Sequence, residues 1–264
     1  MAVRSALFNV MSAAALKAAR GLKRDFGEVE QLQVSVKGPG DFVSTADFKA
    51  EKTLHTELAK ARPGFGFLME ESGASPASDG RHRWIVDPLD GTTNFLHGVP
   101  HWAISIGLER DGEIIAGLIY HPIADEMFWA EKGGGAYLND RRLRVSARRT
   151  LEESLIGTGI PFRGHGDHER YLRTLRAVMG ITTGARRMGV ASLDLAYVAA
   201  GRYDGYWEFG LKPWDIAAGL ILVREAGGTI GGLGEGEPFA TGDVLAANGP
   251  LYIPLRKLLT EAIG

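Results

Sequence analysis

The sequence contains no cysteine among its 264 residues, and this absence removes several kinds of chemistry. A chain without cysteine has no disulfide, no thiolate nucleophile and no cysteine-based zinc site, a composition that fits a reducing cytoplasm. Any metal bound by side chains must therefore be held by carboxylates or histidines. No stretch approaches the roughly 20 apolar residues of a membrane span, so no membrane association is expected.

The sequence also lacks a strong excess of charge of either sign. Its formal net charge is −2, which provides no bulk attraction to nucleic acid, so nucleic acid is not an expected partner. No P-loop is present, nor a Gly-x-Ser-x-Gly elbow, nor a G-x-G-x-x-G motif between a strand and a helix. Nucleotide-binding and serine-hydrolase functions therefore lose their usual support.

The chain has 45% hydrophobic residues, enough to bury a large core. Alternating apolar residues before residue 146 indicate antiparallel hairpins, and beyond about residue 150 strands and helices alternate, as in an α/β layer. Helices are expected at about 3–24, 168–178, 193–200 and 213–226. We expect one α/β domain of two packed halves, about 1–148 and about 149–264.

The most informative stretch runs from Trp84 to Phe95 and reads WIVDPLDGTTNF. Its first residues have the β-branched and aromatic character of a buried strand, which Pro88 is expected to end because proline has no N–H for the ladder. Gly91 permits a tight turn. Thr92 and its neighbours can then cap a short helical turn whose N–H groups suit an anion such as phosphate.

Two aspartates, Asp87 and Asp90, follow this strand. An Asx turn, which is common, needs only one of them. Two carboxylates about 4 Å apart would repel by roughly 4 kcal/mol at an effective dielectric near 20, and a cation between them relieves the repulsion. Oxygen ligands favour Mg²⁺ over zinc. A phosphatase of the haloacid dehalogenase type, with Asp87 as nucleophile in Asp-x-Asp, is disfavoured because the spacing here is Asp-x-x-Asp with Pro88.

Other acids occupy similar positions. Glu70 ends a second strand-like run, and its neighbour Glu71 could face solvent. Asp215 falls in the first turn of the helix expected from Pro213, where it could also simply complement the helix dipole. Asp47 lies in the first turn of a helix that begins with a hydroxyl cap, and capping alone explains it adequately.

Three segments together resemble the inositol monophosphatase family of Mg²⁺-dependent phosphatases. They are Asp87-Pro-Leu-Asp-Gly-Thr-Thr-Asn-Phe95, Lys212-Pro-Trp-Asp-Ile-Ala-Ala-Gly219 running into Glu225-Ala-Gly-Gly228, and Met69-Glu-Glu-Ser72. The resemblance implies a layered αβαβα sandwich of the inositol monophosphatase and fructose-1,6-bisphosphatase type. It also implies two or three Mg²⁺ ions per site, inhibition by lithium and a homodimer. The cytoplasmic location that we expect follows instead from the absence of cysteine.

The resemblance also implies roles for individual residues. Glu70, Asp87, Asp90 and the carbonyl of Leu89 would hold Mg²⁺, and Asp215 would join the two aspartates around a second ion. Glu70 and Thr92 would orient the attacking water, and Asp47 would hydrogen-bond Thr92. The substrate-binding residues so implied are Gly91 and Thr92 through their amides, Glu208, Asp215 and Lys37.

The substrate is less closely defined than the chemistry. Thr92-Thr-Asn-Phe95 together with Glu208 favours inositol 1-phosphate or a similar small phosphorylated polyol. The family also includes phosphatases for histidinol phosphate, fructose 1,6-bisphosphate, NADP and adenosine 3′,5′-bisphosphate, and the fold does not choose among them. A fold retained mainly as a regulatory interaction partner is another alternative, although the intact acidic set argues against lost catalysis.

Overall fold

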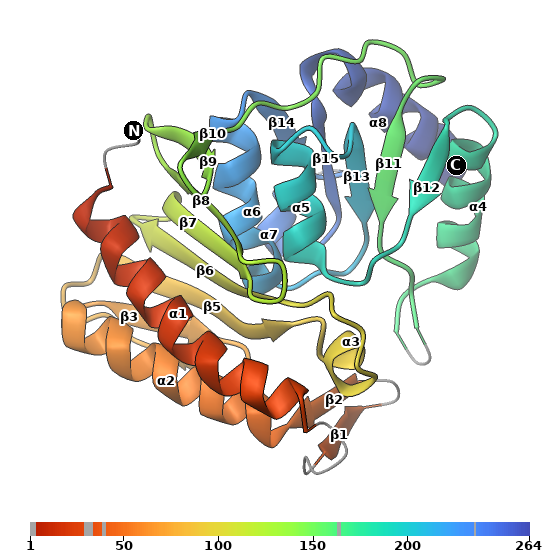
Figure 1. Ribbon diagram of the computed structural model, residues 1–264. Coiled ribbons are helices and arrows are strands. Elements are labelled where there is room, and N and C mark those ends of the chain that lie inside the picture. The colour runs from red at the N-terminus through yellow and green to blue at the C-terminus, as the bar shows by residue number, and fades with distance from the viewer. Residues whose placement is uncertain (1–3, 29–33, 39–40, 163–164, 235) are drawn as a thin grey trace.

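The computed structural model of the chain describes residues 4–28, 34–38, 41–162, 165–234 and 236–264, with only the backbone described for 34–38 and 41–43. Helices and sheets alternate in layers (Figure 1). The helical layers contain α1 (Ala6–Phe26) and α2 (Thr45–Ala61), then α5 (Ala191–Ala199) and α6 (Pro213–Glu225), and then α4 (His168–Met179) and α8 (Gly249–Ile263). The αβαβα sandwich predicted from the family resemblance is therefore confirmed.

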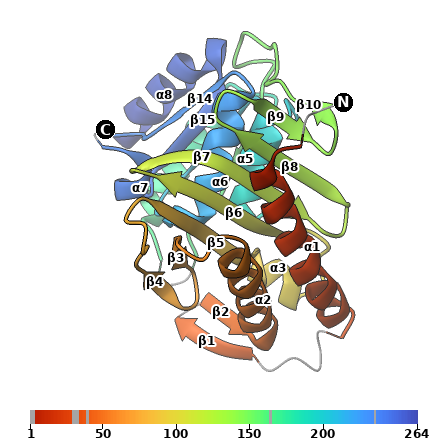
Figure 2. The same cartoon turned by 90° about the vertical axis from the view of Figure 1, so that its left-hand side faces the viewer.

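The first sheet is eight-stranded and mostly antiparallel, in the order β10-β9-β8-β7-β6-β5-β3-β4. Helices α1 and α2 lie side by side across one of its faces (Figure 2). Its strands are β3 (Gly66–Met69), β4 (Gly73–Ser75), β5 (His82–Asp90), β6 (Ala103–Arg110), β7 (Glu113–His121), β8 (Glu126–Glu131), β9 (Gly135–Leu138) and β10 (Arg141–Arg142). Because β3 and β5 are parallel, the residues that follow them meet at one edge.

The second sheet is five-stranded, in the order β12-β11-β13-β15-β14. Strand β11 runs parallel to β13, with Thr158 opposite Trp207, so the next residues, Gly159 and Glu208, come to the same edge. The strands are β11 (Leu155–Thr158), β12 (Gly184–Arg186), β13 (Gly205–Glu208), β14 (Gly228–Gly231) and β15 (Val244–Asn248). The remaining elements are β1 (Val34–Gly38), paired with β2 (Asp41–Ser44), and the short helices α3 (Thr92–Leu96) and α7 (Pro238–Thr241).

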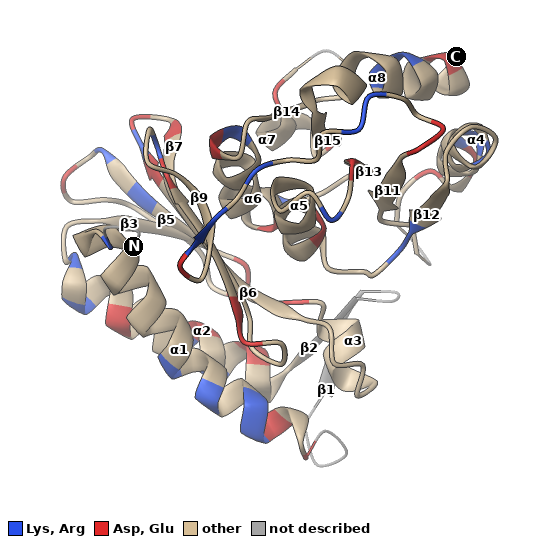
Figure 3. Ribbon diagram, turned by 45° about the horizontal axis from the view of Figure 1, so that its top comes forward, with Lys and Arg blue, Asp and Glu red and all other residues tan. Residues whose placement is uncertain are grey.

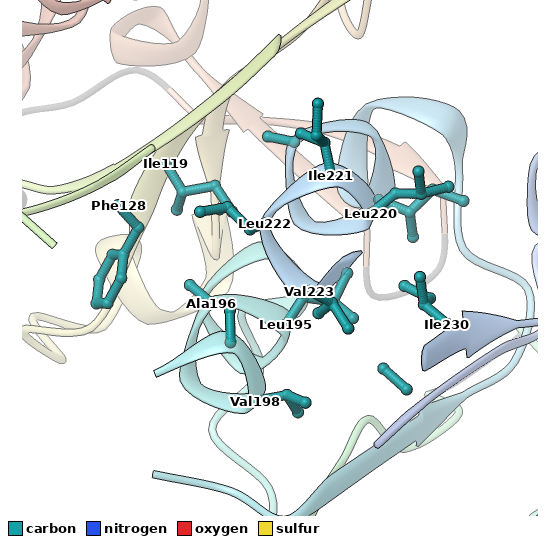
Figure 4. Packing of buried hydrophobic residues seen from close by; sticks show 14 of the residues in the cluster. Ile119, Phe128, Leu195, Ala196, Val198, Leu220, Ile221, Leu222, Val223 and Ile230 are labelled. Carbon is teal, nitrogen blue, oxygen red and sulfur yellow. The ribbon is translucent and has the colours of Figure 1, made fainter. Parts of the chain in front are cut away.

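Helix α6 is buried between the two sheets and forms much of the core. Leu222 and Val223 pack among side chains of the first sheet and of α5 (Figure 4). The approach is close, because a Cβ atom at Gly107 of β6 would lie 2.7 Å from the Cβ of Ala217. The hydroxyl of Ser105 also donates to the carbonyl of Trp214 at 3.2 Å. These contacts hold the start of α6 against the sheet that carries Asp87.

One local prediction was wrong. Strand β5 does not end at Pro88 but continues to Asp90, with a shift of register between Asp87 and Asp90 in its pairing with β6. At this irregularity the missing N–H of proline costs no ladder hydrogen bond, which is why the strand tolerates it. The shift also changes the direction in which the side chains after Asp87 point.

The division into halves near residue 148 stays a prediction, and the structure shows how closely the two parts are joined. Helices α5 and α6 belong to the later part of the sequence, yet both contact strands of the first sheet.

Acidic and basic residues both occur on α1, α2 and α8 (Figure 3). Among the described helices, none is long and apolar enough to cross a membrane.

Candidate active site

A pocket of about 430 Å³ lies where the edges of the two sheets meet the start of α6. Glu70 of the first sheet, Glu208 of the second sheet and Asp215 of α6 line it together. Gly159 and Trp214 also contribute to its wall. Acids from the first sheet, the second sheet and α6 therefore share one cavity.

Four acids, Glu70, Asp87, Asp90 and Asp215, form an acidic group beside the pocket. Asp87 and Glu70 are paired within it. Asp87 is buried, and its carboxyl is hydrogen-bonded to that of Glu70 and accepts from the backbone N–H of Leu89 at 2.9 Å. Burial raises the pKa of Asp87 well above its ordinary value, and the negative charge of Glu70 raises it further. A cation beside this pair would favour its ionised form.

Asp90 is held by a segment that the sequence analysis did not single out. Its carboxylate accepts a hydrogen bond of 2.7 Å from the backbone N–H of Ser192, in the first turn of α5. Burial raises the pKa of Asp90 to about 6, although the Ser192 hydrogen bond opposes this rise. No local signal pointed to Ser192, because the contact depends on how α5 packs against the first sheet.

Asp215 is the third residue of α6, as expected. Its carboxylate accepts from the backbone N–H of Lys212 at 2.7 Å and so caps the helix. Burial raises the pKa of Asp215 well above its ordinary value, and the charge of Asp90 raises it further. Capping and a role in the acidic group are therefore compatible for this residue.

The four acids Glu70, Asp87, Asp90 and Asp215 fit a cation by their charge. Each of Asp87, Asp90 and Asp215 has its pKa raised by the charge of Glu70, which means that the ionised groups repel one another. Within the described residues, no three acidic or histidine side chains are already arranged to hold a metal ion. The three aspartates accept main-chain hydrogen bonds instead. The donor set is made of oxygen alone, and a hard divalent cation would relieve its repulsion.

Thr92 and Asp47 meet beside this group. The Thr92 hydroxyl lies 3.0 Å from a carboxylate oxygen of Asp47 and 3.1 Å from the carbonyl oxygen of Leu89. The other carboxylate oxygen of Asp47 accepts from the N–H and the hydroxyl of Ser44, which begins α2 as its N-cap. Asp47 therefore both caps a helix and contacts Thr92.

The turn at Gly91 differs in detail from the expected hydroxyl cap. Gly91 itself is the N-cap of α3, with a φ of +94°, and no side chain caps this helix. A Cβ atom at Gly91 would lie 2.8 Å from a methyl group of Val190. Val190, the residue before α5, thus packs directly against the turn. Glycine is required at residue 91 both because φ is positive and because a side chain would collide with Val190.

Glu208 lines the pocket from the end of β13 in the second sheet. The hydroxyl of Tyr206 donates a hydrogen bond to its carboxylate. A Cβ atom at Gly159 would lie 1.8 Å from Cδ of Glu208, so the carboxylate lies directly over this glycine. Burial raises the pKa of Glu208 to about 7. The sequence analysis identified Glu208 but neither Tyr206 nor Gly159.

Asp194 of α5 is buried, and neither of its carboxylate oxygens has a hydrogen-bond partner within the described residues. Burial raises the pKa of Asp194, and the charge of Glu208 adds to the rise.

Lys37, predicted near the phosphate, belongs to β1, but its side chain lies outside the described residues.

Known proteins resemble this chain over almost its whole length. Residues 4–263 match the inositol monophosphatase family. An inositol-1-monophosphatase of Rhizobium meliloti is 58% identical over 261 residues, covering 98% of each chain. A protein of Pseudomonas aeruginosa named Nus factor SuhB is 44% identical, covering 92% of this chain and 91% of the other. The crystal structure of the extragenic suppressor protein suhB from Bartonella henselae superposes with a TM-score of 0.95 at 56% identity, covering 97% of this chain and 99% of that one.

These similarities agree with the site. The Rhizobium relative confirms the prediction of a phosphoric monoester hydrolase. The fold agrees with that of the Bartonella structure, and the acids of all three predicted segments lie around one pocket. On this evidence the chain belongs to the inositol monophosphatase family.

Proposed function

We propose that this protein hydrolyses the phosphate ester of a small polyol, with inositol 1-phosphate as the preferred substrate, in a reaction that requires Mg²⁺. One observation carries the proposal: Glu70, Asp87, Asp90 and Asp215 gather and repel one another beside a pocket that Glu208 also lines. The name of the Rhizobium relative, inositol-1-monophosphatase, supports it.

The four acids, with the carbonyl of Leu89, would hold two or three Mg²⁺ ions. When bound, Mg²⁺ supplies hydroxide from water and neutralises charge on the phosphate and on the leaving alkoxide. Such help is needed because phosphate monoesters require up to ~10²¹-fold acceleration, which one general base does not supply.

The chain itself would position the attacking water. The carboxylate of Asp47, fixed by Ser44, accepts the hydrogen bond of the Thr92 hydroxyl, so the Thr92 oxygen would be left to accept a hydrogen bond from water. Glu70 would accept a hydrogen bond from the other O–H of that water, so that the two residues together orient it. The amides of Gly91 and Thr92, at the turn after β5, would bind the phosphate oxygens, and we retain Lys37 as a further candidate there.

Glu208 would bind the leaving alcohol. One of its carboxylate oxygens is held by Tyr206, which fixes the carboxylate in the pocket. Its raised pKa means that it can accept or donate a hydrogen bond near neutral pH, and either mode suits the hydroxyl groups of a polyol. This contact is the basis for preferring inositol 1-phosphate over substrates with fewer hydroxyls.

The test is phosphate release from a panel of esters with Mg²⁺ and after exhaustive chelation. The panel contains inositol 1-phosphate, histidinol phosphate, fructose 1,6-bisphosphate, NADP and adenosine 3′,5′-bisphosphate. We expect fastest release from inositol 1-phosphate, none after chelation, and inhibition by millimolar lithium. Full activity in chelator would contradict the metal requirement. No turnover of any ester would favour a regulatory role instead, and light scattering would test the expected homodimer.

A further inference from the structure

The segment Phe209–Lys212 connects β13 to α6 along the pocket. It begins directly after Glu208 and leads into α6, where Asp215 lies. All four of its residues line the pocket. The position of this segment therefore sets the spacing between the group proposed to bind the alcohol and an acid proposed to hold the metal.

An ion pair outside the pocket fastens this segment. Arg170 of α4 donates a hydrogen bond of 2.7 Å to the carboxylate of Asp243, and the side chains are 28% and 17% exposed. The other carboxylate oxygen of Asp243 accepts from the backbone N–H of Gly210 at 3.3 Å. The guanidinium of Arg170 also lies over the ring of Phe209, 4.0 Å from its centre. Both partners of the ion pair thus touch the segment.

The backbone beside Asp243 is equally close. The N–H of Leu211 donates to the carbonyl of Gly242 at 2.9 Å. A Cβ atom at Gly242 would lie 2.4 Å from the carbonyl oxygen of Leu211, and Gly242 has a φ of +71°. The segment is therefore held from one side by the turn before β15 and from the other by α4.

We propose that the Arg170–Asp243 ion pair is a positioning device for Glu208 and so determines how tightly the polyol part of the substrate binds. The inference rests on the proposed function, in which Glu208 contacts the alcohol. Arg170 does not line the pocket and acts through Phe209 and Asp243, so it is a positioning residue and not a catalytic one.

The main test compares Arg170→Gln with wild type on two substrates. We expect the KM for inositol 1-phosphate to rise roughly 10-fold, with kcat changed less than about 3-fold, because a charge-assisted contact that fixes the loop is lost. Glycerol 2-phosphate, which offers fewer hydroxyls, should show a smaller rise in KM. Adding Asp243→Asn should cost little more than Arg170→Gln alone. Exchanging the charges, as in R170D/D243R, should recover part of the affinity.

A similar ion pair elsewhere provides a matched control. Arg202 binds Glu126, the side chains are 35% and 21% exposed, and the Arg202 guanidinium lies 4.8 Å from the ring centre of Tyr197. None of these residues lines the pocket. Arg202→Gln should lower the melting temperature about as much as Arg170→Gln without changing KM. An unchanged KM in Arg170→Gln, or an equal rise for both substrates, would overturn the proposal.

A second measurement needs no substrate. Of the five tryptophans, Trp84, Trp102, Trp129 and Trp207 are buried, so Trp214 at the pocket should dominate quenching of fluorescence by acrylamide. We expect stronger quenching in Arg170→Gln and none of this increase in Arg202→Gln. If wild type fails to hydrolyse inositol 1-phosphate, the proposed function fails, and quenching alone decides whether the pair holds the segment. Equal quenching in both variants would refute it.

Discussion

The backbone N–H of Ser192 lies 2.7 Å from the carboxylate of Asp90, although 102 positions separate the two residues. Asp90 ends a strand of the first sheet, and Ser192 lies in the first turn of α5, which also contacts the second sheet. The acidic group is therefore assembled by the packing of two distant segments. Its geometry depends on the helices between the sheets as much as on β5.

Replacement of Asp90 by asparagine should separate catalysis from folding. Asp90→Asn keeps the side-chain volume but removes one of the mutually repelling charges. We expect turnover with Mg²⁺ to fall at least about 100-fold and the metal-free protein to melt at a higher temperature than wild type. Steady-state kinetics and calorimetry in chelator measure the two effects. Near-normal turnover would mean that Asp90 is only a turn residue.

Glu208→Gln should alter substrate preference. Loss of a charge-assisted hydrogen bond costs about 1.5 to 3 kcal/mol, which is roughly a 10- to 150-fold loss of kcat/KM for inositol 1-phosphate. Glycerol 2-phosphate should lose less, and the Mg²⁺ requirement should persist. The measurement is kcat/KM for both substrates in both proteins. An equal loss would show that Glu208 supports the fold or the acidic group instead.

Gly159→Ala should reproduce much of this change without touching Glu208. A methyl group at residue 159 would lie 1.8 Å from Cδ of Glu208, so the carboxylate must move. We therefore expect a comparable loss for inositol 1-phosphate, and little additional loss when Glu208→Gln is combined with it. Gly21→Ala is the control, because nothing lies within 4 Å of a Cβ there. Full activity of Gly159→Ala would show that Glu208 need not occupy its present position.

The metal-free protein should lose stability as the pH rises. The pKa of Glu208 is about 7 in the folded chain and 4.5 as its ordinary value, so the folded state binds this proton more tightly. Its stabilising effect is complete below pH 4.5 and is lost as the pH rises to about 7, on the order of 3 kcal/mol. Urea unfolding in chelator should show this slope, and Glu208→Gln should flatten it. An unchanged slope in the variant would assign the effect to other acids.

The predictable part of the site is the part encoded in short segments. Asp87 and Asp90 follow an apolar run, and Asp215 follows Pro213 at the start of a helix, so strand ends and a helix start could be located from local pattern. The parallel pairing of β3 with β5 then brings Glu70 to Asp87. Lys37 and the roles of the acids stay predictions.

The remaining contacts depend on tertiary packing and had no local signal. Ser192 meets Asp90 only because α5 lies against the first sheet, and Gly159 meets Glu208 only because β11 pairs with β13. The continuation of β5 past Pro88 was missed for a related reason. Proline forbids a ladder hydrogen bond, but the shifted register at this point does not require one.

The order of synthesis leaves the face of the first sheet that contacts α6 at Gly107 uncovered during part of translation. The strands of the first sheet are complete by Arg142, whereas α5 and α6, which contact one of its faces, end at Ala199 and Glu225. On the ribosome this apolar face therefore stays exposed until more than half of the remaining chain has emerged. During this interval chaperones can bind it. We expect a fragment ending near residue 150 to aggregate, because the helices that cover this face of the sheet are missing from it.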